Sequence, residues 1–126
     1  MSNKLQIHEF DPVIYPYRLW VCVTDSLEPI KERFLTDKQK EIEGDFDSFK
    51  AFAISVIEKS DKYSHGVVIV FKKKEYMTSG LIAHECYHAT QSLWESIQET
   101  YPSEEATAYL LQWFVERCLE FKDKIK

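Results

Sequence analysis

The sequence predicts an α+β domain in which a small, mostly antiparallel sheet is covered by helices. Three short segments, residues 17–24, 52–57 and 67–71, are rich in the β-branched and aromatic residues that favour strands. Two long amphipathic segments, each preceded by capping residues, fill the C-terminal part of the chain. Strands and helices segregated in this way are typical of a sheet with helices packed on it.

Length and composition predict a single domain over residues 1–126. The chain has 126 residues, of which 44% are hydrophobic and 14% aromatic, and this is enough for one core and too little for two. Only three glycines and four prolines occur, without any repeat or low-complexity stretch. We therefore expect no linker.

The N-terminal half predicts a strand followed by a short helix. Residues 17–24 (YRLWVCVT) have strand composition. Asp25 is a residue type that caps helices, so a helix is expected over residues 27–35. Residues 36–47 are polar and do not determine an element.

The two further strands, residues 52–57 (FAISVI) and 67–71 (VVIVF), are separated by the polar, turn-like residues 59–66. An antiparallel hairpin is the simplest arrangement. Residues 67–71 fit two interpretations, a core strand or an exposed edge that binds an extended peptide by β-addition.

Two helices are expected after the hairpin. The first begins near Gly80, with Thr78 or Ser79 as its cap. The second follows Ser103 and runs to about Phe121.

The first of these helices contains the sequence HECYH at residues 84–88. Because side chains four residues apart lie on the same face of a helix, His84 and His88 can bind one tetrahedral zinc ion. Glu85 lies beside them and can take a proton from water that the metal acidifies. An ordinary amphipathic helix with two histidines on its solvent face explains the string alone equally well.

The arrangement of polar residues around this helix favours the metal site. One arc of the helix is almost wholly polar, whereas the opposite arc is mainly apolar. The polar arc comprises Gln91, His84, Glu95, His88, Ser92, Glu85 and Ser96.

A catalytic zinc needs a third protein ligand, and no histidine follows His88. Glu105, at the start of the last helix, shares a polar sector with Tyr109, whereas Glu104 projects towards apolar positions. We therefore predict Glu105 as the third ligand. This requires the first helix to stop near Ile97, so that the following residues can run back towards His88.

Tyr109 follows Glu105 by one turn of the same helix. A tyrosine there can orient a ligand imidazole or donate a hydrogen bond to the oxyanion of a tetrahedral intermediate. Simple amphipathic packing is the alternative.

Composition excludes several classes of function. The formal net charge of -5 argues against a nucleic-acid partner, which would need clustered Lys and Arg. No apolar run is long enough to span a bilayer and no secretory signal begins the chain, so a cytoplasmic protein without membrane contact is expected. Three cysteines in apolar segments predict reduced, buried thiols. The oligomeric state is left open.

With HECYH at residues 84–88 and SEEATAYLLQWF at residues 103–114, the chain resembles compact gluzincin-type metallopeptidases. It is similar to small HExxH proteins encoded by phages and prophages and, more distantly, to ImmA/IrrE-type peptidases. The resemblance covers about residues 65–121 and implies a zincin-like fold. It implies His84, His88 and Glu105 as Zn²⁺ ligands, and Glu85 as general base.

The function expected from these residues is zinc-dependent hydrolysis of a peptide or protein substrate. The alternative is a noncatalytic, phage-type interaction protein that keeps the metal site for stability. The intact Glu85 favours hydrolysis, because a structural site needs no acid beside its ligands.

Overall fold

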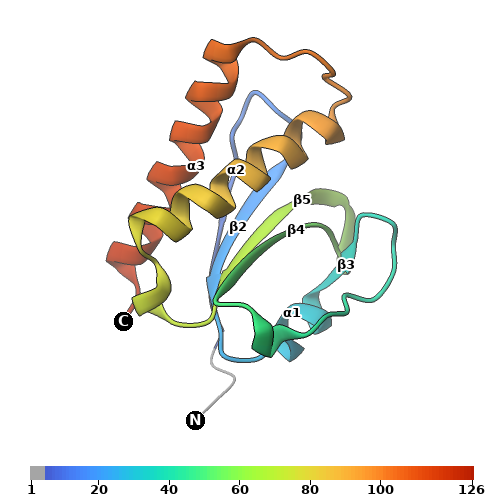
Figure 1. The fold of residues 1–126 in the computed structure, drawn as a ribbon. Coiled ribbons are helices and arrows are strands. Elements are labelled where there is room, and N and C mark those ends of the chain that lie inside the picture. The colour runs from blue at the N-terminus through green and yellow to red at the C-terminus, as the bar shows by residue number, and fades with distance from the viewer. Residues whose placement is uncertain (1–4) are drawn as a thin grey trace.

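The computed structural model describes residues 5–126, and all side chains among them except those at positions 47, 62 and 63. Within these residues, a five-stranded mixed sheet carries helices on both faces (Figure 1). The elements are, in chain order, β1 (Gln6–Phe10), β2 (Arg18–Val23), α1 (Glu28–Arg33), β3 (Phe34–Thr36), β4 (Ala51–Glu58), β5 (Asp61–Phe71), α2 (Ser79–Ser96) and α3 (Glu104–Lys124), with single 3-10 turns at Phe46–Ser48 and Lys74–Tyr76. The predicted α+β class is confirmed.

The strand order is β1-β2-β5-β4-β3, and in the described residues every neighbouring pair is antiparallel except β2 and β5. The parallel pair arises because β2 and β5 are joined by a long crossover that contains α1, β3 and β4. β5 therefore lies in the middle of the sheet. The edge interpretation of residues 67–71 is wrong, and the core-strand interpretation is confirmed.

Each face of the sheet has its own apolar core. The face covered by α2 and α3 receives Leu19, Val21, Val67, Ile69 and Phe71, together with Phe114 and Leu93 from the helices. The face covered by α1 receives Trp20, Cys22, Val68 and Val70, together with Ile30 and Phe34. Because both faces are covered there, residues 19–23 of β2 and 67–71 of β5 are continuous apolar runs, and each large side chain buried in them contributes roughly 1.5–3 kcal/mol.

The N-terminal elements agree with the sequence only in part. The strand predicted at residues 17–24 is β2, and the predicted hairpin is formed by β4 and β5. The turn is shorter than predicted, since β5 already begins at Asp61. β1 and β3 were not predicted, because β1 is largely polar and β3 has only three residues.

The start of α1 corrects the prediction for Asp25. The N-cap is Leu27, which makes no side-chain cap, and the hydroxyl of Ser26 accepts a hydrogen bond from the amide of Glu28 at 3.2 Å. The helix ends at Arg33, since Phe34 is already extended and pairs with Glu58 of β4. Strand pairing thus ends the helix before its predicted limit at residue 35.

Both C-terminal helices begin where the capping residues predict. The Thr78 hydroxyl accepts a hydrogen bond from the amide of Leu81 at 3.2 Å, and the Ser103 hydroxyl accepts one from Ala106 at 3.0 Å. α2 ends at Ser96, with Ile97 as its C-cap, which confirms the predicted stop. α3 continues one turn beyond the predicted end, to Lys124.

The position of α3 along α2 is set by two buried contacts. The indole nitrogen of Trp94 donates a hydrogen bond to the Thr107 hydroxyl at 3.1 Å. Further along, Cys86 and Cys118 bring their sulfur atoms to 3.6 Å. The start of α3 therefore lies beside the end of α2, and the two helices run back past each other (Figure 1).

The three thiols are expected to be inert in the native protein. Cys22, Cys86 and Cys118 are free and buried, and burial raises the pKa of Cys22 well above its usual range. We expect no reaction with a chromogenic disulfide reagent under native conditions and three reactive thiols in denaturant. A thiol that reacts in the native protein would contradict the burial of these three side chains.

Among residues 5–126, no helix is both long enough and apolar enough to cross a bilayer.

Candidate metal centre

His84 and His88 lie side by side on the exposed face of α2. Their Nε2 atoms are 3.3 Å apart, and their rings meet almost edge to face, with centroids 4.9 Å apart. The separation of one helical turn predicts this pairing, and the structure shows it.

The distance between the two nitrogens fits a shared metal ion. Zinc binds imidazole nitrogens at about 2.0–2.1 Å in a tetrahedral arrangement, so two such ligands lie about 3.3 Å from each other. The Nε2 atoms of His84 and His88 have this spacing. Both rings are exposed, so an ion can reach them from solvent. Nitrogen donors of this kind suit zinc better than magnesium or calcium.

Glu85 differs from the two histidines in being buried. Its side chain is only 5% exposed, and it lines the same groove as both imidazoles. Burial raises the pKa of Glu85, while the neighbouring charges of His84 and His88 act in the opposite direction. A carboxyl group in this position can exchange protons with a molecule held at the imidazoles.

A groove runs between α2 and β4, and it contains all three of these residues. It has a volume of about 820 Å³. Its strand side carries the small side chains of Ala51 and Ala53, which leave the space above them open. The residues that line it are Ser48, Phe49, Lys50, Ala51, Phe52, Ala53, Gly80, Leu81, His84, Glu85, His88, Gln91, Ser92 and Glu95.

The part of β4 beside this groove is an open sheet edge. β3 pairs only with Val56, Ile57 and Glu58, so within the described chain residues 51–55 pair with β5 alone. An edge of this kind presents backbone donors and acceptors that can pair with another chain.

The hydrogen-bond pattern between β4 and β5 determines which backbone groups of β4 face outward. In an antiparallel pair, residues that bond to the neighbouring strand alternate with residues whose N–H and C=O point away from it. The carbonyl of Lys50 accepts a hydrogen bond from the amide of Lys72 at 3.0 Å, so Lys50 belongs to the first kind. The amides and carbonyls of Ala51, Ala53 and Ser55 therefore point outward, away from β5.

The structure does not bring Glu105 to the histidines. No group of three or more His, Cys, Asp or Glu side chains is gathered for a metal within residues 5–126. Glu105 lies just before Thr107, which is hydrogen-bonded to Trp94. Trp94 is six residues beyond His88, or about 9 Å along the helix axis.

The reason for this separation is the packing of the two helices. The predicted stop of α2 and the polar sector of α3 are both present, and Glu105 and Tyr109 are exposed as expected. The returning segment, however, stops level with Trp94 instead of reaching His88. Moving Glu105 to the histidines would break the contacts that hold α3 in place.

Tyr109 is likewise placed away from the groove. Its side chain is 67% exposed and does not line the groove. In this arrangement it neither orients an imidazole nor faces a reacting carbonyl.

Tyr17 is a residue near the groove that sequence reasoning did not select. Its side chain is 2% exposed, and its hydroxyl lies 3.4 Å from that of Ser55 on β4. The pKa of Tyr17 is raised to about 12, mainly by burial; hydrogen bonds to Ser55 and Ser92 lower it, and the charges of Asp37 and Glu95 contribute to raising it. Tyr17 thus links β4 to α2 beyond the histidines. Sequence reasoning placed Tyr17 only at the start of a predicted strand, which does not indicate a contact with α2.

The pKa of Tyr17 predicts a loss of stability at high pH. An unfolded tyrosine ionises near pH 10, whereas the folded one, packed against the His65 ring, keeps its proton to about pH 12. Between these values the unfolded state binds fewer protons, so the free energy of unfolding falls by about 1.4 kcal/mol per pH unit. Denaturant unfolding from pH 9 to 12 should show this slope to be smaller in Tyr17→Phe. Equal slopes would contradict the buried, protonated hydroxyl.

Comparisons of the chain with protein-family models, with curated proteins and with solved structures find no match. The functional argument therefore rests on the chain's own residues. The strongest of these are the two imidazoles and the buried carboxyl group in the groove beside β4.

Proposed function

We propose that this protein is a zinc-dependent peptidase of the zincin-like kind, with His84 and His88 as two of the three protein ligands that a catalytic zinc needs and Glu85 as general base. The described residues do not bring a third ligand to the histidines. The observation that carries the proposal is the 3.3 Å spacing of the two Nε2 atoms, which suits two ligands of one zinc ion. The buried Glu85 beside them supports catalysis, because a purely structural site has no use for a carboxyl group there.

Glu85 performs the proton transfers in this proposal. A bound zinc ion would supply a Lewis acid that polarises the scissile carbonyl and acidifies water. Glu85 takes a proton from the attacking water and then passes it to the leaving amine, so it ends the cycle in its starting state.

The open edge of β4 supports a peptide as substrate. An extended peptide can pair with the outward groups of Ala51, Ala53 and Ser55, as in other cases of β-strand addition. This places its backbone in the groove that contains His84 and Glu85. A small, compact substrate would leave these backbone groups unused.

Replacing each of the two glutamates at the start of α3 tests whether either of them is a metal ligand. Because Glu105 lies apart from the histidines, we expect both Glu105→Ala and Glu104→Ala to change the zinc dissociation constant less than about tenfold. Zinc competition titrations with a chromogenic chelator measure both. A selective loss in Glu105→Ala would show that the first turn of α3 does reach the ion, as the sequence predicts.

Metal content and proteolysis test the proposal as a whole. Protein purified without chelator is expected to hold one zinc per chain and to cleave fluorescently quenched, unfolded casein. A chelator should stop the cleavage and added zinc should restore it. Protein that binds no zinc would overturn the proposal. Zinc binding without cleavage of any unfolded substrate would favour the noncatalytic alternative.

A further inference from the structure

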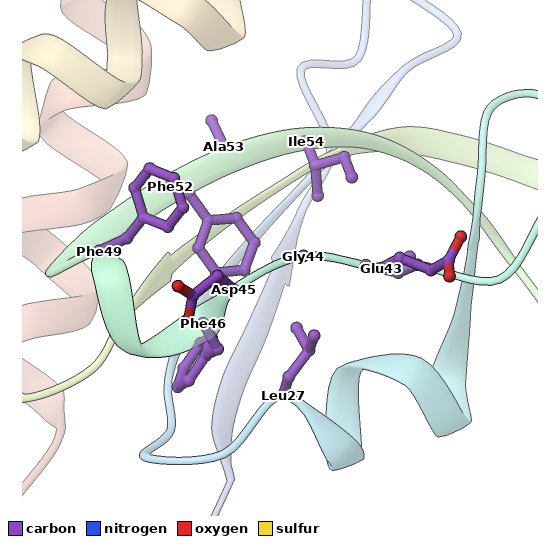
Figure 2. A pocket seen from close by; sticks show the side chains of 10 residues that line it. Leu27, Glu43, Gly44, Asp45, Phe46, Phe49, Phe52, Ala53 and Ile54 are labelled. Carbon is purple, nitrogen blue, oxygen red and sulfur yellow. The ribbon is translucent and has the colours of Figure 1, made fainter.

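An apolar pocket lies on the opposite face of β4 from the groove. It has a volume of about 180 Å³. Its apolar walls are formed by Leu27, Ile42, Phe46, Phe49, Phe52 and Ile54. In Figure 2 the rings of Phe46, Phe49 and Phe52 gather on one side of this pocket, and Leu27 and Ile54 lie on the other.

The pocket and the groove flank the same open edge. Side chains alternate along β4, so Phe52 and Ile54 face the α1 side and line the pocket, while Ala51 faces α2 and lines the groove. Phe49, Phe52 and Ala53 line both spaces, so the pocket and the groove meet at this edge. A strand added to residues 51–55 alternates in the same way, and therefore sends successive side chains to the groove and to the pocket.

We propose that this pocket is a specificity site that receives one aromatic or branched aliphatic side chain of an extended peptide bound along the open edge of β4. The identity of that peptide as a substrate rests on the proposed function, whereas the binding itself does not. The outward amides and carbonyls of Ala51, Ala53 and Ser55 are spaced to pair with an extended backbone.

The size, polarity and charge of the pocket determine which peptide side chain it can receive. A cavity of about 150 Å³ lined by Leu, Ile and Phe is large enough to bind benzene, so this pocket can hold a phenyl or leucyl group. The three aromatic rings around it offer edge-to-face contacts, as Phe46 and Phe52 already make with each other at 5.8 Å. Glu43 and Asp45 are among the lining residues, and their negative charges disfavour an acidic side chain in the pocket.

Binding of end-blocked hexapeptides to the Glu85→Gln protein in the presence of chelator tests the proposal without cleavage or metal. The peptides consist of serine and threonine with one varied central residue, and fluorescence anisotropy measures their dissociation constants. We expect peptides with central phenylalanine or leucine to bind roughly tenfold to a hundredfold more tightly than those with glycine or aspartate. Equal binding of all four would overturn the proposal.

Two further arms locate the binding site. Leu27→Trp, which fills the pocket, should abolish the preference for phenylalanine, whereas Ile14→Trp, at an exposed residue away from it, should leave the preference unchanged. Circular dichroism shows whether each variant is folded. In addition, N-methylation of successive peptide residues should weaken binding at every second position, because only alternate amides face β4. Loss at every position, or at none, would contradict pairing along this edge.

The test of the pocket and the test of the peptidase can give different outcomes. A preference for phenylalanine in a protein that never cleaves peptides supports the pocket and overturns the peptidase. Chelator-sensitive cleavage whose rate and binding are both independent of the varied residue supports the peptidase and overturns the pocket.

Discussion

Glu85→Gln is expected to slow peptide hydrolysis about 10²–10⁴-fold while leaving zinc binding unchanged. Glutamine keeps the shape of the buried side chain and loses the ability to take a proton from water. Because the neutral amide of glutamine needs no charged partner in the groove, the variant should keep its fold. Turnover of quenched casein at saturating zinc, compared with zinc content measured on the same sample, gives both quantities.

Glu95→Gln is the matched control for this experiment. Glu95 lies on the same helix and lines the same groove, but it is exposed and lies seven residues beyond His88. Its replacement should change turnover less than about threefold. If Glu85→Gln retained native turnover, or if both variants lost activity equally, Glu85 would not be the base.

His84→Ala and His88→Ala are each expected to weaken zinc binding at least about a hundredfold. Removing one imidazole leaves a single nitrogen donor at the site, and even partners outside the ligand shell are worth about 10–100-fold in affinity. Because both rings are exposed, neither replacement should unfold the protein. Isothermal titration with zinc measures the loss, and thermal unfolding without metal measures the stability.

His8→Ala provides the control for nonspecific zinc binding. His8 is exposed on β1, on the edge of the sheet remote from β4, and packs only against Phe10 among the ring contacts described. Its removal should leave zinc affinity unchanged. A fall in affinity equal to that of His84→Ala would mean that zinc binds to surface histidines without a defined site.

The local parts of the candidate site were predictable because helical geometry alone determines them. The cap at Thr78, the helix over residues 84–88 and the pairing of the two imidazoles depend on residues within one or two turns of each other. The burial of Glu85 was not predictable in this way. It was assigned to the polar arc, yet it is only 5% exposed, because α2 packs on β4 and β5 and Glu85 lies at the base of the groove.

The strands at the edges of the sheet were missed for a similar reason. β1 is mostly polar and pairs with one neighbour only, so its sequence lacks the apolar alternation of a buried strand. β3 has three residues, and its pairing with Glu58 and Ile57 of β4 decides its conformation against a local preference for helix. Because β3 is so short, it pairs with one end of β4 only, and the edge of residues 51–55 stays open.

The sequence by itself determined the α+β class, the central hairpin and the two histidines on one face of a helix, because these depend on short-range periodicity and capping. Only the tertiary structure decided where α3 lies along α2, which strand edge stays open and where the apolar pocket forms. These features depend on contacts between residues distant in the chain, such as Trp94 with Thr107 and Cys86 with Cys118. A helical sector fixes the direction of Glu105 around its axis, whereas side-chain packing between helices fixes its distance from His88.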